Sequence, residues 1–162
     1  GDGDPHTFVI PFEDKDLEGK LGSPQAQAKG GGDTAEDVAG GLEAVADLPW
    51  QCTTRLVFLF ADAPGHGKDY HDKSVDDDYP IEHMMRELKS DCKIDFVLCS
   101  LNENMKKMTA IMEREFNAAP KTKSGERPQT FRVASLSDVK SFVPTVVESI
   151  SKAAGFAAPV NI

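Results

Sequence analysis

Cysteine, basic side chains and long apolar runs are all scarce in this chain of 162 residues. Its three cysteines, Cys52, Cys92 and Cys99, are odd in number and lack metal-ligand spacing, which argues against a disulfide framework and favours reduced thiols. The chain has only 18 basic residues against 27 acidic ones, which gives a formal net charge of −9. That charge argues against nucleic acid or an anionic membrane surface as the partner, and favours a cation or a basic protein surface.

The sequence predicts neither a membrane-spanning nor a targeting segment. Its most apolar run, Leu56 to Phe60, is far shorter than the roughly 20 residues that cross a bilayer. No charged-then-apolar leader opens the sequence. We therefore predict a cytoplasmic protein without membrane insertion. Because the chain begins at Gly1 and soon enters a strand-like run, Thr7 to Phe12, we expect it to be a piece of a longer polypeptide.

Several familiar binding motifs are absent or incomplete. The glycine-rich run Gly30 to Thr34 lacks the spacing of a dinucleotide site, and Lys68 is followed by Asp69 rather than by the hydroxyl of a phosphate loop. The run from Asp72 to Asp78 imitates a calcium loop but lacks its glycine and its closing glutamate. No Gly-x-Ser-x-Gly elbow is present either. The sequence thus shows no recognisable nucleotide, calcium or acyl-transfer site.

Strand-like and helix-like segments alternate along the chain, which is typical of parallel βαβ units. We predict one α/β domain with a doubly wound, mostly parallel sheet and helices on both faces. The apolar run Arg55 to Ala61 has the pattern of a central strand covered on both faces. Asp33 or Thr34 is expected to cap the first long helix. The expected strands are 7–12, 55–61, 94–100 and 130–133, and the expected helices are 34–48, 81–90, 105–117 and 136–154.

Parallel sheets of this kind bind ligands at the carboxyl ends of their strands. This rule places three features on one rim: Asp62 after the second strand, the loop Gly30 to Thr34, and the loop around Asn102. A hydroxyl and a carboxylate on one rim are suitable ligands for a hard cation. The rim is therefore the predicted functional site.

Several motifs together resemble the von Willebrand factor A (vWA) domain, in the branch that accompanies atypical alpha-type protein kinases. The central ones are Gly30 to Asp37 and Ala61 to Gly67, followed by Tyr70-His71. The opening Gly1 to Pro5 and the later Asp77 to Pro80 also look like that branch. The resemblance implies a Rossmann-like domain over residues 1–154, with residues 155–162 as a tail.

In this family a magnesium or manganese ion occupies a metal-ion-dependent adhesion site built from three loops. The resemblance places Thr34 in the second loop and Asp62 in the third. The first loop, an Asp-x-Ser-x-Ser run, has no counterpart here, and the first central strand is absent with it. Magnesium prefers six oxygen ligands, so we expect weak binding by this chain. We expect the missing strand to come from upstream sequence or from another chain.

The resulting functional prediction is a non-catalytic protein-interaction module, part of a larger alpha-kinase-like protein. A metal held by Thr34 and Asp62 would contact a partner carboxylate, with Asp33, His66, His71 and Asn102 as further rim or loop contacts. Any Ser/Thr kinase activity would belong to another part of the parent protein.

Two alternatives stay open. In the first, Asp62, His66 and His71 bind zinc or manganese and form a metal-assisted hydrolase. In the second, the chain is a structural docking piece of a larger kinase and binds no ligand on its rim. Metal analysis and an Asp62→Ala variant distinguish these readings.

Overall fold

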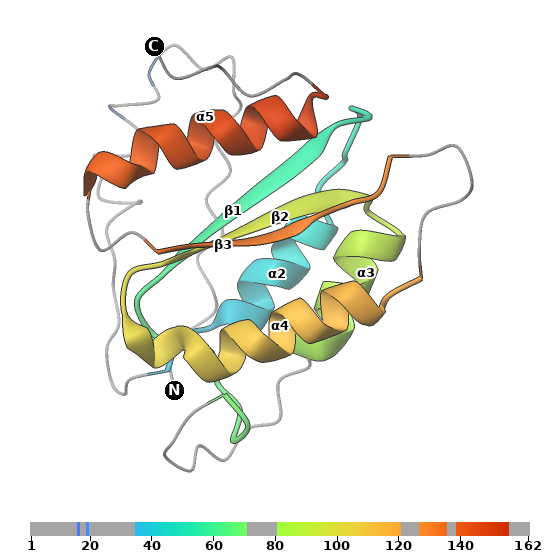
Figure 1. The fold of residues 1–162 in the computed structure, drawn as a ribbon. Helices are drawn as coiled ribbons and strands as arrows, with labels where there is room; N and C mark the ends of the chain where they lie inside the picture. The colour runs from blue at the N-terminus through green and yellow to red at the C-terminus, as the bar shows by residue number, and fades with distance from the viewer. Residues whose placement is uncertain are drawn as a thin grey trace. The chain divides into compact units, whose positions relative to one another are not determined.

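The computed structural model describes residues 16, 19, 35–70, 81–120, 127–135 and 139–155 (Figure 1). The chain divides into two units, Gly1–Thr34 and Ala35–Ile162, and the helices and strands below all belong to the second. The predicted strand Thr7 to Phe12 lies outside the described residues. So do Asp33, Thr34 and His71.

The second unit is an α/β structure with a three-stranded parallel sheet in the order β1-β2-β3. Figure 1 shows α5 on one face of this sheet and α2, α3 and α4 on the other. The described part of the chain thus confirms the parallel sheet and the helices on both faces. The strands are β1 (Arg55–Ala61), β2 (Ile94–Ser100) and β3 (Phe131–Ser135). The helices are α2 (Val38–Ala46), α3 (Ile81–Ser90), α4 (Lys106–Ala118) and α5 (Phe142–Ala153), with short 3-10 helices η1 (Glu103–Met105) and η2 (Val139–Ser141).

The position of β1 in the sheet corrects one prediction. The apolar run Arg55 to Ala61 was expected to be a central strand covered on both faces, but among the described strands it pairs only with β2. Its residues are mostly half-buried, and Phe60 is 45% exposed. Among the described strands, the central and fully enclosed one is β2, whose residues Ile94 to Cys99 are all buried. A continuous apolar pattern identifies a strand but does not say which neighbours will cover it.

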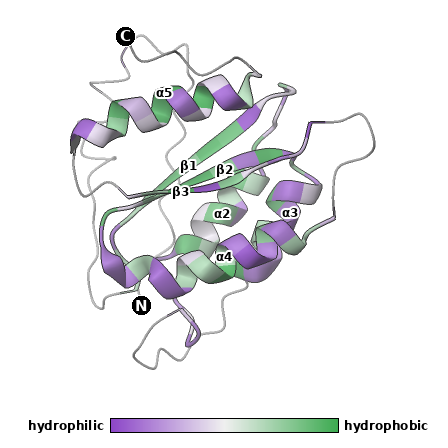
Figure 2. Cartoon of the chain, in the orientation of Figure 1, coloured by the Kyte–Doolittle hydropathy of each residue, from purple (hydrophilic) through white to green (hydrophobic). Residues whose placement is uncertain are grey.

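The core lies between the sheet and the three helices on its α2–α4 face. Alternate residues of β2 point into it, and methionines of α3, η1 and α4 help to fill it. Figure 2 shows the contrast between the largely hydrophobic β1 and the hydrophilic stretches of α3 and α4. The fully enclosed side chains of this core include Phe96, Leu98, Met85, Leu88, Met108, Met112 and Phe116.

Helix α2 begins later than predicted, at Val38, and Asp37 is its cap. The Asp37 carboxylate accepts a hydrogen bond from the Gly40 amide at 2.9 Å. Glu36 cannot join the helix because it forms a parallel bridge with Gly65. The expectation that Asp33 or Thr34 caps this helix was therefore wrong.

The described helices lie close to their predicted ranges, and the cysteines are reduced, as predicted. Helix α5 begins at Phe142, after η2, rather than at residue 136. No helix within the described ranges is long and apolar enough to cross a membrane. Cys52, Cys92 and Cys99 are all free thiols, and the burial of Cys99 raises its pKa.

Candidate functional site

Asp62 and Asn102 meet at the carboxyl ends of β1 and β2. Asp62 is the first residue after β1 and is exposed. The Asn102 side-chain amide donates a hydrogen bond to the Asp62 carbonyl oxygen, and the Leu101 amide donates to the Ala61 carbonyl at 3.0 Å. The parallel pairing of the strands brings these loops together, as the rim rule predicts for the two residues.

Asn102 has a structural role on this rim. Its side-chain oxygen accepts from the Asn104 amide at 2.9 Å, which caps η1. Its carbonyl oxygen accepts from the Ser100 hydroxyl at 2.7 Å. Because both ends of the Asn102 amide are engaged, this side chain fixes the two loops relative to one another. Its side-chain oxygen retains a second lone pair, so the role of Asn102 as a ligand contact on the rim stays a prediction.

Exposed apolar residues lie near Asp62 in the chain and at the end of the neighbouring strand. Phe60, two residues earlier, is 45% exposed, and Leu101 is 46% exposed. Phe142, at the start of α5, lies with its ring centroid 5.5 Å from that of Phe60 and is 38% exposed. We call Phe60, Asp62, Leu101, Asn102 and Phe142 the rim patch. It combines one carboxylate with a surface that is largely apolar.

The loop that follows Asp62 is held firmly on both sides. The Glu36 amide donates to the Pro64 carbonyl at 3.1 Å, and the His66 amide donates to the Glu36 carbonyl at 3.2 Å. Gly65 is packed so tightly against its neighbours that an added Cβ would lie 3.0 Å from Cβ of Val38. The loop therefore presents Asp62 from a fixed backbone, which suits a binding site.

Tyr70 anchors the end of this loop. It is 3% exposed, and its hydroxyl donates to a carboxylate oxygen of Glu82 on α3. Burial, together with this hydrogen bond, raises the pKa of Tyr70 well above its ordinary value. Since the neutral phenol is the form that the folded protein holds, this contribution to stability is present below pH of about 10 and is lost only in stronger base.

Gly67 is required where the loop turns toward Tyr70. Its φ of +131° lies outside the range that other residues readily adopt, and an added Cβ would meet the Tyr70 ring at 2.5 Å. We expect Gly67→Ala to lower the free energy of unfolding by about 2–3 kcal/mol, measured by urea denaturation. Gly41→Ala in α2 is the control, because an added Cβ there meets nothing within 4 Å. It should instead stabilise by about 0.5–1 kcal/mol. Equal effects of the two substitutions would contradict this account.

The structure locates only part of the predicted ligand set. His66 is half-buried in the loop after Asp62, while Thr34, Asp33 and His71 lie outside the described residues. Among the described residues, no group of three or more His, Cys, Asp and Glu side chains could hold a metal ion. In this part of the chain the predicted metal ligands therefore reduce to the single carboxylate of Asp62.

The apolar members of the rim patch were not predicted from the sequence. Phe60 was assigned to a strand covered on both faces, and Leu101 and Phe142 were not singled out. The available signal was their position at the ends of predicted elements, next to Asp62 and Asn102. A large apolar residue at such a place either packs under a loop or remains exposed, and only the fold decides which.

Comparisons with known proteins link part of the chain to a kinase. No protein-family model matches it, and no solved structure does. Over 57 residues it is 44% identical to alpha-protein kinase vwkA of Dictyostelium discoideum. The match covers 35% of this chain and spans only 9% of that protein. The chain is therefore similar, over about a third of its length, to a small part of an alpha-protein kinase, and its assignment to the vWA family stays a prediction.

Proposed function

We propose that this chain is a non-catalytic protein-interaction module of vWA type within a larger alpha-kinase-like protein. The partial similarity to an alpha-protein kinase supports the second part of this proposal. Any phosphoryl transfer is assigned to another part of the parent protein. The module's contribution is recognition.

The rim patch is the observation that carries the proposal. Phe60 and Leu101 are nearly half exposed and lie at the ends of β1 and β2, as the exposed Asp62 does. Burying such apolar side chains against a partner is favourable by about 25 cal/mol per Å². A fixed backbone keeps the patch in shape before the partner arrives, which reduces the entropy lost on binding. An apolar patch rimmed by polar groups is a common feature of protein contact surfaces.

A divalent cation fits this site only weakly. Asp62 supplies one carboxylate, and we propose Thr34 as the second ligand. Two ligands leave most of the six positions around magnesium to water. A bound ion would supply an open coordination position for a carboxylate of the partner. Asp62 itself would hold the ion, while Phe60 and Leu101 would bury apolar surface of the partner.

We also propose that a strand from outside this chain completes the sheet beside β1. Among the described strands β1 is paired on one edge only, although its sequence is almost wholly apolar. Strand edges of that composition are normally covered or paired. A strand added there would end near Asp62 and could bring further oxygen ligands to the rim.

A magnesium titration followed by heat denaturation tests the cation part. Magnesium at about ten times its Kd should stabilise by about 1.4 kcal/mol, which is about 3–6 °C in Tm for a chain of this size. Asp62→Ala should abolish the rise in Tm. Asp69→Ala removes an equal charge from the same loop and should leave the rise intact. If neither this chain nor the longer parent protein responds to magnesium, the proposed cation site is wrong.

A further inference from the structure

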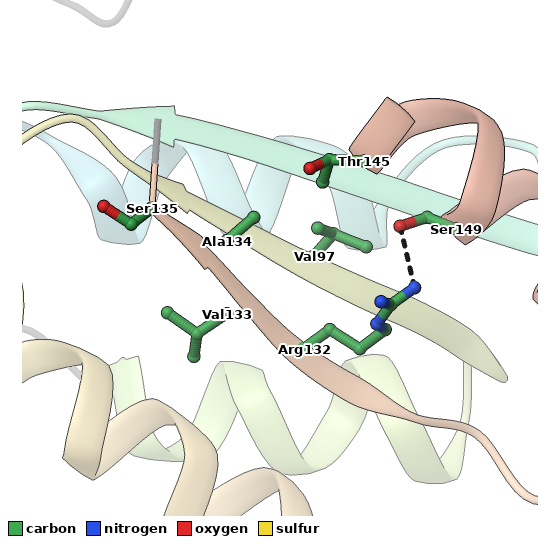
Figure 3. Close-up of a pocket in the computed structure, with 7 residues that line it drawn as sticks. All are labelled: Val97, Arg132, Val133, Ala134, Ser135, Thr145 and Ser149. Atoms are coloured by element: carbon green, nitrogen blue, oxygen red, sulfur yellow. Dashed lines mark hydrogen bonds between the residues drawn. The ribbon is translucent and has the colours of Figure 1, made fainter. Parts of the chain in front are cut away.

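A hollow lies on the α5 face of the sheet, between β3 and α5 (Figure 3). Its volume is about 130 Å³, several times the roughly 30 Å³ share of one water molecule in the liquid. Val97 and Ala134 form its apolar floor, and the small side chain of Ala134 keeps it open. Ser135 lies at the end of β3 that borders it. The hollow is large enough for a group of several atoms.

Among the described residues that line this cavity, Arg132 is the one with a charged side chain. Its guanidinium donates to the Ser149 hydroxyl oxygen at 3.2 Å and lies 3.0 Å from a carboxylate oxygen of Glu148. Only 29% of the Arg132 side chain is exposed, so its charge is partly shielded from water. A guanidinium has five N–H donors, and these two contacts use only part of them.

Two hydroxyls from α5 face the same space. Thr145 and Ser149 are four residues apart, which places them on one side of the helix. Figure 3 shows both projecting from α5 toward the sheet, above Val97. Ser149 is 3% exposed, and because its oxygen accepts from Arg132, its own proton is available as a donor. The polar side chains around the hollow therefore present donors to whatever occupies it.

We propose that this cavity binds a small tetrahedral oxyanion, a phosphate or a phosphate monoester, through Arg132, Thr145 and Ser149. A planar carboxylate would be satisfied by the guanidinium fork alone. Two hydroxyl donors on a separate helix suit a group with acceptor oxygens in more than one plane. Partial burial strengthens each of these contacts relative to water.

Glu148 would compete with a bound anion for the Arg132 guanidinium, but it also has a second cationic partner. Its carboxylate also accepts a hydrogen bond from Lys152, one turn later on α5. Lys152, and then Arg132, hold the pKa of Glu148 below its usual range, so it is ionised at neutral pH. When an anion binds the Arg132 guanidinium, Glu148 keeps its ion pair with Lys152. The exchange therefore leaves no carboxylate without a counter-charge.

An NMR titration at constant ionic strength tests the proposal, with inorganic phosphate and phenyl phosphate as probes. The backbone amide signals of Thr145 and Ser149 and the Arg132 side-chain signal should shift with either probe. Arg132→Gln should weaken binding about tenfold or more, and the isosteric Thr145→Val should weaken it several-fold, about threefold to tenfold. A tighter Kd for phenyl phosphate than for phosphate would identify a monoester as the ligand, and the reverse order would identify the free ion.

The controls separate a specific site from general charge effects. Lys107→Gln changes the net charge as much as Arg132→Gln but lies on α4, and it should leave Kd unchanged. Glu148→Gln removes the competitor and should tighten binding, about threefold or more. The proposal is overturned if Lys107→Gln and Arg132→Gln weaken phosphate binding equally, or if Glu148→Gln weakens it. It is also overturned if acetate shifts the same NMR signals as much as phosphate does. These results do not depend on Asp62, so the proposed rim function stands or falls separately.

Discussion

Replacing Phe96 by alanine is expected to lower the free energy of unfolding by about 3–5 kcal/mol. Phe96 is fully enclosed on the central strand β2. Its ring stacks on that of Phe131 from β3, with centroids 5.6 Å apart and an angle of 2° between the planes. Phe131 in turn packs against Phe116 of α4 at 5.7 Å. The substitution would open a cavity where the sheet and α4 meet. Urea denaturation at 25 °C measures the loss.

Phe60→Ala is the matched control, with the same change of side chain on the neighbouring strand. Phe60 is 45% exposed, although its ring contacts those of Phe58 and Phe142. We expect its loss to cost about 1 kcal/mol, because little enclosed surface is removed. Equal losses for the two variants would show that β1 is as enclosed as β2. That outcome would contradict the exposed rim patch.

Asp95→Ala is expected to have the second large effect, about 3 kcal/mol in free energy of unfolding. The Asp95 carboxylate is 2% exposed at the start of β2, and Arg127 binds both of its oxygens. The amide and hydroxyl of Thr130 also donate to it, at 2.9 and 2.8 Å. Removing the carboxylate would leave all these donors without their acceptor and would loosen the entry to β3.

Asp95→Asn separates charge from hydrogen bonding. Asparagine keeps an oxygen that can accept from Thr130, but it loses the ion pair with Arg127. Since Arg127 is 37% exposed, water can solvate its charge, and the loss should be about half of that seen with alanine. If Asp95→Asn and Asp95→Ala destabilise equally, the hydrogen bonds to Thr130 contribute little and the charge dominates.

The sequence predicted the bounds of a strand or helix well where a single hydrophobic pattern determined them. The bounds of β1, β2 and α3 agree with those expected, because apolar runs of strand length and an amphipathic helix leave little choice. The start of α2 was missed because Asp37 and Asp33 are both acceptable caps. The bridge between Glu36 and Gly65, which decides between them, joins residues far apart in sequence.

The candidate sites were predictable only in part. Asp62 and Asn102 follow successive strands, so the rule for parallel sheets was enough to bring them together. The cavity at Arg132 could not be foreseen, since Ser149 lies 17 residues away and meets it only when α5 crosses the sheet. Likewise, the exposure of Phe60 depends on which strands flank β1. The contribution of Thr34, His71 and Asp33 to the rim stays a prediction.

Manganese binding followed by electron paramagnetic resonance tests most directly the proposal that Asp62 is part of a weak cation site on a protein-binding rim. Free Mn²⁺ gives a sharp signal that is lost on binding, so one titration reports affinity and the number of sites. We expect one weak Mn²⁺ site in this chain, for which magnesium competes. The site should be lost in Asp62→Ala and retained in Asp69→Ala. Binding that is unaffected by Asp62→Ala, or no binding by either this chain or the longer parent protein, would contradict it.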